Sequence, residues 1–151
     1  MCIRDSLTTS GLASLHNALK LFSDKGKGEG KIYVSDYLTF TQPEALRRIR
    51  QFRNIETRIL VNKAYHGKGY LFKCGEQFDC LIGSSNLTAQ ALTSNDELNF
   101  HFTASAESKS IADFLKIFKS NFDQASILTD EYLSIYTNKS VSYTHLTLPT
   151  N

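Results

Sequence analysis

Short apolar stretches of two different periods alternate along the chain, and this alternation limits the fold more than any other feature. Runs rich in β-branched and aromatic residues, such as 31–35 and 57–62, have the length and composition of strands. Elsewhere apolar residues recur at three- and four-residue offsets, most clearly from Ile111 to Phe122, which is typical of an amphipathic helix. Strands that alternate with helices predict an α/β protein with a sheet flanked by helices.

The expected elements can be placed along the sequence. We expect a first helix capped by Ser10, and a second helix that Thr41 and Glu44 open as a capping box. A third helix follows the stripe from Ile111 to Phe122. Strands are expected at 31–35, 57–62, 68–73, 78–82 and 98–103.

Size and charge narrow the class of protein. A chain of 151 residues with 41% hydrophobic residues is long enough for one domain with a real core. The net charge of +2 is too small to argue for nucleic acid by itself. We find no apolar run that could span a bilayer and no secretory signal, so we expect a cytoplasmic protein without a membrane partner.

The three cysteines, Cys2, Cys74 and Cys80, form no C-x-x-C pair, which favours a reducing compartment. Cys74 and Cys80 could face each other across a hairpin, or join His66 in a metal site. Their spacing is poor for metal ligation, however, and cysteine is commonly a small buried residue. We therefore expect no metal.

Both ends of the chain look foreign to the rest. Residues 1–6 and 141–151 resemble translated sequencing-adapter read-through, so we take 7–140 as the domain and expect it to be a fragment. Cys2 and His145 then carry no functional weight. We also expect the sheet to lack its first strand.

Polar side chains with the chemistry of a phosphate site gather in two stretches. His66 and Lys68 are two residues apart on an expected strand, so both side chains emerge on the same face. The segment G-S-S-N-L-T, 83–88, follows a buried-looking strand and opens onto a helix-like segment. Its backbone amides and the side chains of Ser84 and Asn86 can therefore surround an anion.

A carboxylate completes this set. Glu97, at the start of the next expected strand, can accept a hydrogen bond from an imidazole and fix its tautomer. Asp96 competes with it for this role, and Asp79 is interpreted as a strand-edge charge. In a phosphodiester site, lysine and asparagine orient phosphate oxygens, the histidine attacks phosphorus and the acid holds the histidine.

Together these residues resemble the phospholipase D-like phosphodiesterases, whose signature is H-x-K, then G-S-x-N, then a downstream acid. The three parts stand here at 66–68, 83–86 and Glu97, and the resemblance covers nearly all of residues 8–137. Many members have an aspartate five residues after the lysine, where this chain has Lys73. That difference is typical of restriction endonucleases of the BfiI and NgoFVII kind and of the phospholipase D-like domain that precedes certain DEAD/DEAH-box helicases.

The spacing of the motifs agrees with the same branch. The lysine and asparagine are 86 − 68 = 18 residues apart, and the asparagine and glutamate are 97 − 86 = 11 apart. The wider runs T-T-S-G-L and Y-V-S-D-Y-L-T-F-T-Q-P-E-A-L-R-R-I look most like the helicase-attached version.

The resemblance implies a metal-independent nuclease that acts on DNA through a phosphohistidine at His66 and needs no cofactor. Lys68, Asn86 and Ser84 would bind the phosphate, and Glu97 would complete the catalytic set. Members use two histidines at one phosphorus, whereas this chain has one H-x-K. The resemblance therefore implies a homodimer with a shared site, and a helicase or specificity domain in the full-length protein.

Two alternatives stay open. The chain could be a non-catalytic DNA-binding or docking module of a helicase, or a structural α/β domain in which the motifs are coincidental. Arginines on the second expected helix could meet DNA phosphates, although a solvated helix face explains them as well; they are Arg47, Arg48, Arg50 and Arg53. The sequence suggests no partner for His16 or His101.

Overall fold

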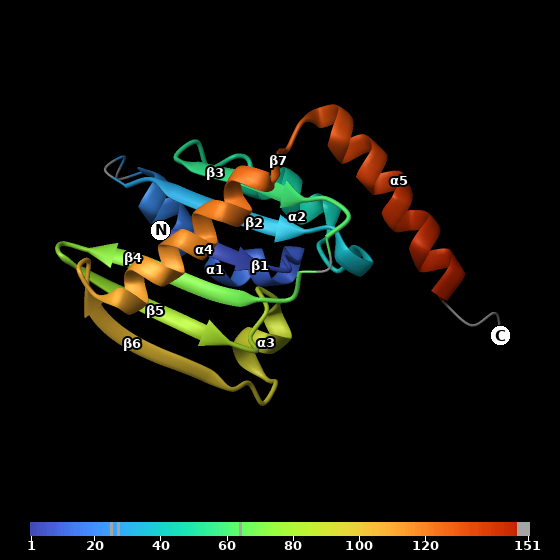
Figure 1. The fold of residues 1–151 in the computed structure, drawn as a ribbon. Coiled ribbons are helices and arrows are strands. Elements are labelled where there is room, and N and C mark those ends of the chain that lie inside the picture. Colours follow the sequence, from blue (N-terminus) through green and yellow to red (C-terminus); the bar gives the residue numbers. More distant parts are fainter. Residues whose placement is uncertain (25, 27, 64, 148–151) are drawn as a thin grey trace.

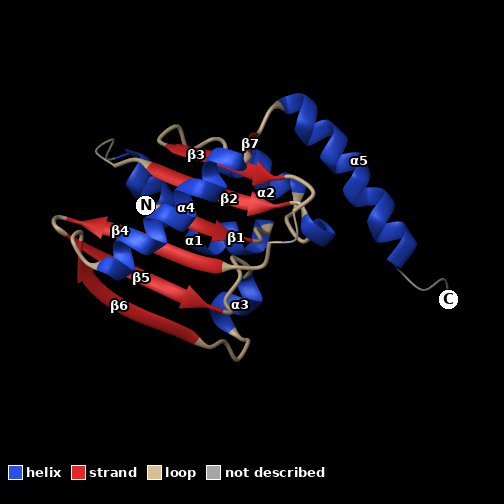
Figure 2. Cartoon of the chain, in the orientation of Figure 1, coloured by secondary structure: helices blue, strands red, loops and turns tan. Residues whose placement is uncertain are grey.

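A seven-stranded sheet with helices on both faces forms the molecule (Figures 1 and 2). The computed structural model describes residues 1–24, 26, 28–63 and 65–147. The strands are β1 (Cys2–Asp5), β2 (Gly30–Ser35), β3 (Ile55–Leu60), β4 (Lys68–Cys74), β5 (Gln77–Gly83), β6 (Asn99–Ser105) and β7 (Ser126–Ile127). The helices are α1 (Thr9–Asp24), α2 (Pro43–Ile49), α3 (Ala89–Thr93), α4 (Lys109–Gln124) and α5 (Asp130–Thr147), with a short 3-10 helix, η1, at Tyr37–Thr39.

The strand order is β6-β5-β4-β1-β2-β3-β7, and the sheet is mixed. β1, β2 and β3 are parallel, whereas β4, β5 and β6 form an antiparallel meander that pairs with β1 through β4. This confirms the predicted α/β fold with a mixed sheet and flanking helices. The order also means that the connection 61–67, between β3 and β4, must cross the ends of β2 and β1.

Alternate side chains of the strands feed two hydrophobic cores. In β2, Ile32 and Val34 pack with α1, α2 and α5, whereas Tyr33 points to the opposite face and packs with α4. The stripe predicted for α4 is confirmed, since Ile111, Phe114, Phe118 and Phe122 are all buried against that face. Burial of each such side chain contributes roughly 1.5–3 kcal/mol, so α4 is firmly held on the sheet.

The N-terminal residues are part of the sheet. The sequence analysis placed 1–6 outside the domain and expected a missing first strand, but Cys2–Asp5 form β1 at the centre, between β2 and β4. Both neighbours present unpaired backbone groups to this gap, and any short extended segment can satisfy them. This strand could not be predicted from the sequence, because four residues are too few to show an alternating pattern. Whether both ends are foreign stays a prediction.

The C-terminal helix α5 was not anticipated and continues to Thr147, beyond the expected boundary at 140; residues 148–151 of the excluded end lie outside the described part. Leu133 and Tyr136 bury one side of α5 in the core, and the Tyr136 hydroxyl donates a hydrogen bond to the Thr41 carbonyl at 2.7 Å. No helix within the described residues has both the length and the apolar character needed to cross a membrane.

Two expected helix caps differ in the structure. The Gly11 amide donates to Thr8 Oγ1 at 3.1 Å, so Thr8 rather than Ser10 caps α1. The Thr41 hydroxyl donates to the Ser35 carbonyl at 2.9 Å, so the expected capping box does not form at α2. At α2 the Ser35 carbonyl competes for the hydroxyl, which a local sequence pattern cannot reveal. At α1 the helix already begins at Thr9, so Ser10 lies inside it and the cap falls earlier in the chain.

Docking of α5 should fail at alkaline pH. Burial, followed by the charge of Asp36, raises the pKa of Tyr132 to about 12, and burial raises the pKa of Tyr136 still further. A phenol whose folded pKa exceeds its unfolded value near 10 stabilises the fold fully below pH 10 and loses this contribution as pH rises through 12. We expect tyrosinate absorbance from these two residues to appear only as α5 detaches. In the Tyr136→Phe variant, the tyrosinate absorbance that appears as α5 detaches should come from one tyrosine fewer. Titration of every tyrosine near pH 10 without unfolding would contradict the prediction.

Candidate functional site

Three strands of the meander meet in register at one edge of the sheet, and the predicted site residues surround this row. Lys68 of β4 pairs with Gly83 of β5, which in turn pairs with Asn99 of β6. Neighbouring strands are about 4.8 Å apart, so the three positions span about 10 Å. The remaining predicted residues lie just outside the row: His66 before β4, Ser84 and Asn86 after β5, and Glu97 before β6. The structure thus brings every predicted site residue to a single edge.

His66 and Lys68 are in direct contact. Lys68 Nζ lies 3.0 Å from His66 Nδ1, 2.9 Å from Nε2 and 3.2 Å from the His66 carbonyl oxygen. The two ring nitrogens point in different directions, so an atom equally close to both lies over the ring and not along either nitrogen's hydrogen-bonding axis. Lys68 is only 6% exposed, whereas His66 is exposed. The site therefore presents an accessible imidazole backed by a fixed ammonium group.

The loop after β5 is fixed from two sides. Tyr70 donates its hydroxyl to the Ser85 carbonyl at 3.0 Å, and the Asn99 amide donates to Ser85 Oγ at 2.6 Å. On the other side the Leu87 amide donates to the Ser6 carbonyl at 3.2 Å. Sequence reasoning missed Tyr70 and Asn99, because their role depends on strand register. These bonds hold the segment that carries Asn86.

Asn86 itself has an unused polar atom. Its Oδ1 is buried and has no hydrogen-bond partner among the described residues. An unsatisfied buried amide is uncommon in folded proteins and is often found where a ligand binds. The two ends of a carboxamide are assigned from their surroundings, so a rotation of the side chain would present its NH₂ to an anion instead. Asn86 is thus suited to a ligand that is rich in oxygen atoms.

Helix α1 lies tightly against this loop at Gly11. A Cβ placed on Gly11 would lie 1.9 Å from the carbonyl oxygen of Leu87 and 2.7 Å from Thr88 Cα. The Thr8 amide also donates to the Leu87 carbonyl at 3.2 Å. This close backbone approach explains the glycine in T-T-S-G-L, which the sequence analysis noted only as part of a resemblance.

Glu97 binds Ser84 in this structure. The Ser84 hydroxyl donates to the Glu97 carboxylate and accepts from the Leu98 amide at 3.0 Å. The bond to the imidazole, which the sequence analysis expected of Glu97, is not among the contacts of the described residues; His66 lies two strands away. Glu97 is partly buried and Asp96 is exposed, so Glu97 is the better placed carboxylate.

Other candidates take structural or surface positions. Cys74 and Cys80 are both free, and they pair with Gln77 and Leu71 rather than with each other. Cys74 also lies at the end of β4 opposite to His66, so these residues form neither the disulfide nor the metal site considered above. His101 Nε2 lies 3.4 Å from Asp79 on an exposed part of the sheet.

Three of the four arginines considered for DNA contact have protein partners. Their partners lie in α2 and α5: Arg47 with Thr137, Arg48 with Glu44, and Arg50 with Asp130. Two of these contacts join α2 to α5, which gives the arginines a packing role. His16 faces the ring of Phe52, with 5.9 Å between ring centroids.

Comparisons with known proteins support the fold and show the family. The family model of the NgoFVII restriction endonuclease N-terminal PLD domain matches residues 32–128. Among solved structures, the phospholipase D family member Nuc from Salmonella typhimurium is similar, with a TM-score of 0.60 and 19% identity over 86% of this chain and 80% of Nuc. TrmBL2, an archaeal chromatin protein with a novel mode of DNA binding, gives a TM-score of 0.51 and 17% identity over 84% of this chain and 44% of TrmBL2. No curated protein matches the chain.

Proposed function

The chain belongs to the family of the NgoFVII restriction endonuclease N-terminal PLD domain, and from this premise we propose that it hydrolyses phosphodiester bonds in DNA without a metal ion. Membership makes it a PLD-like domain of the phosphodiesterase and nuclease class. The observation that carries the proposal is the row Lys68–Gly83–Asn99, because it brings together an exposed imidazole, a buried ammonium and a carboxamide whose oxygen has no partner among the described residues.

In the proposed reaction, a ring nitrogen of His66 attacks phosphorus. The phosphorus–oxygen bond to the leaving strand breaks, and a second histidine gives its proton to the departing oxygen. That histidine then takes a proton from water, whose oxygen displaces the His66 nitrogen and releases the phosphate end. Lys68 and Asn86 hold the non-bridging oxygens, and so replace the charge that a metal would supply.

The second histidine would come from a second copy of the chain. A twofold dimer that joins the two edges would bring the partner's His66 to the same phosphorus. Exposed apolar side chains beside the row support such an interface: Leu98 is 85% exposed, Phe100 68% and Ile82 37%. Ile82 and Phe100 are directly paired across β5 and β6, so these side chains form one continuous surface.

Glu97 and Ser84 have a supporting part in this proposal. Their mutual hydrogen bond holds the start of the phosphate loop against β6. Glu97 would orient an imidazole only if its carboxylate left Ser84. The wider setting is also proposed: a helicase or specificity domain on the resemblance of the motif spacing and of the runs at 8–12 and 33–49, and a cytoplasmic location on the cysteine pattern.

Cleavage in the presence of EDTA tests the function. We expect the purified chain to nick plasmid or to cut single-stranded DNA at an unchanged rate when EDTA replaces magnesium, because Lys68 and Asn86 supply the electrostatic stabilisation. Gel analysis of the products gives the rate. If a folded, dimeric protein binds DNA and never cuts it, the domain is a binding module instead; if EDTA stops the cleavage, the metal-free mechanism is wrong.

A further inference from the structure

His66 lies in the connection between β3 and β4, outside any helix or strand, and its side chain is exposed. The strand order requires this connection to pass the ends of β2 and β1. A nucleophile must be held accurately, since a misplacement of about 1 Å can cost roughly 100-fold in rate. Some other part of the chain must therefore fix this connection.

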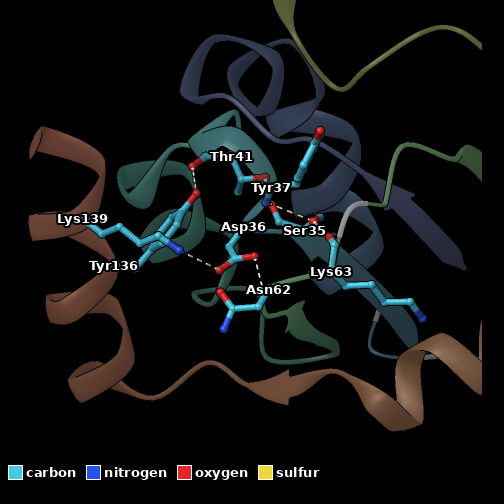
Figure 3. Close-up of polar contacts among 8 residues, drawn as sticks. All are labelled: Ser35, Asp36, Tyr37, Thr41, Asn62, Lys63, Tyr136 and Lys139. Atoms are coloured by element: carbon cyan, nitrogen blue, oxygen red, sulfur yellow. Dashed lines mark hydrogen bonds and ion pairs between the residues drawn. The ribbon is translucent and has the colours of Figure 1, made fainter. Parts of the chain in front are cut away.

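The last residues of β2 and the residue after it provide this support (Figure 3). Asp36 Oδ1 accepts a hydrogen bond from the Asn62 amide at 2.9 Å, and the Ser35 hydroxyl donates to the Lys63 carbonyl at 3.0 Å. Both bonds join side chains at the end of β2 to the backbone of the connection. The segment Y-V-S-D, 33–36, therefore supports the connection between β3 and β4, a role that the proposed reaction does not assign to it.

The bond from Asp36 falls at a strained position. Asn62 has a φ of +54°, in the left-handed region that residues other than glycine adopt at a cost. The Asp36 side chain is only 3% exposed, so water competes little for its oxygens. A shielded carboxylate that accepts the amide of a left-handed residue fixes both the position and the direction of the chain at the start of the connection.

A second contact lies closer to His66. The Tyr33 hydroxyl donates to the Tyr65 hydroxyl at 3.0 Å, and the two rings meet edge to face with 5.5 Å between centroids. A Cβ on Gly67 would lie 2.6 Å from the Tyr65 hydroxyl oxygen, so the Tyr65 side chain rests directly on the backbone between His66 and Lys68. The support from β2 therefore reaches from Asn62 to the H-G-K motif itself.

We infer that Asp36 is a positioning residue for His66, which acts by holding Asn62 in its left-handed conformation and so fixing the start of the connection that leads to His66. The partners of the Asp36 carboxylate among the described residues are Asn62 and Lys139, so any effect on His66 is indirect. The other oxygen of Asp36 accepts from Lys139 of α5 at 3.3 Å, and Lys139 is 52% exposed (Figure 3). The two oxygens thus have separate partners, which allows their effects to be separated by substitution.

Three variants test the inference, and its kinetic part rests on the proposed function. Asp36→Ala removes both bonds, Asp36→Asn keeps an oxygen that can accept from the Asn62 amide, and Lys139→Ala removes only the contact with α5. For folded protein, we expect Asp36→Ala to lower kcat at least tenfold with KM within twofold of the wild type. Asp36→Asn should recover most of kcat, and Lys139→Ala should retain it.

Two NMR measurements on the same proteins do not depend on activity. In Asp36→Ala we expect faster hydrogen exchange at the Asn62 amide and a shifted or broadened His66 imidazole signal, with the His16 and His101 signals unchanged. If Asp36→Ala does not fold, Asp36→Ser takes its place, since its side chain is one bond shorter than that of aspartate.

Two results would overturn the inference. One is a folded variant with wild-type kcat and an unchanged His66 signal, even if its melting temperature falls. The other is an equal loss in Lys139→Ala, which would assign the effect to the ion pair with α5. If the wild type does not cleave DNA, the proposed function fails, and the NMR signals of His66 and Asn62 still decide this inference.

Discussion

Replacement of His66 by alanine is expected to abolish DNA cleavage while leaving the fold intact. In the proposed reaction this imidazole forms the bond to phosphorus, and loss of a covalent nucleophile lowers kcat by about 10⁴-fold or more. The side chain is exposed and its described contacts are with Lys68, so its removal should cost little stability. Single-turnover cleavage of a labelled duplex, together with thermal melting, measures both effects.

Mixtures of the two proteins make this prediction sharper. If each site needs a histidine from both copies, only dimers of two wild-type chains cleave, and activity follows the square of the wild-type fraction. After subunit exchange, an equal mixture should therefore retain about a quarter of the activity of the undiluted wild type. His101→Ala is the matched control, because His101 is also exposed and lies on β6 within the sheet. A linear dependence would show that one histidine suffices, and full activity in His66→Ala would assign the chemistry to another residue.

The features of the fold and site that could be predicted are those that depend on residues close together in the sequence. The apolar stripe from Ile111 to Phe122 predicts α4, because a helix brings residues three and four apart onto one face. In the same way, side chains two residues apart in an extended stretch emerge on the same side, and His66 and Lys68 are in contact although His66 precedes β4. Both inferences depend only on residues close together in the sequence.

What depends on pairing between distant segments could not be predicted. The register of Lys68 with Gly83 arises from the hairpin of β4 and β5, whereas the register of Gly83 with Asn99 is set across the connection that contains α3. This pairing places Glu97 beside Ser84 rather than beside the imidazole. The place of β1 is decided by the gap between two other strands, not by its own four residues. The hydrogen bond from Thr41 to the Ser35 carbonyl likewise prevents the expected capping box at α2.

Gly11→Ala is expected to destabilise the domain and to impair the site at the same time. Replacement of an exposed helical glycine by alanine usually stabilises a protein by about 0.5–1 kcal/mol. Here the new methyl group would meet the Leu87 carbonyl oxygen at 1.9 Å, and neither backbone can rotate away as a side chain would. Overpacking of this kind typically costs 1–3 kcal/mol, so we expect a net loss of roughly 1–2 kcal/mol.

The displacement should reach the phosphate loop, because Leu87 follows Asn86 directly and shares hydrogen bonds with Ser6 and Thr8. We therefore expect cleavage by folded Gly11→Ala to fall more than its stability predicts, with weaker DNA binding if Asn86 no longer reaches the phosphate. Urea unfolding and cleavage at saturating DNA separate the two effects. Ser14→Ala, on an exposed position of the same helix, is the control and should change neither. If Gly11→Ala is more stable than the wild type and equally active, then α1 does not hold the loop, and the position of Asn86 must depend on the contacts with Tyr70, Asn99 and Ser6.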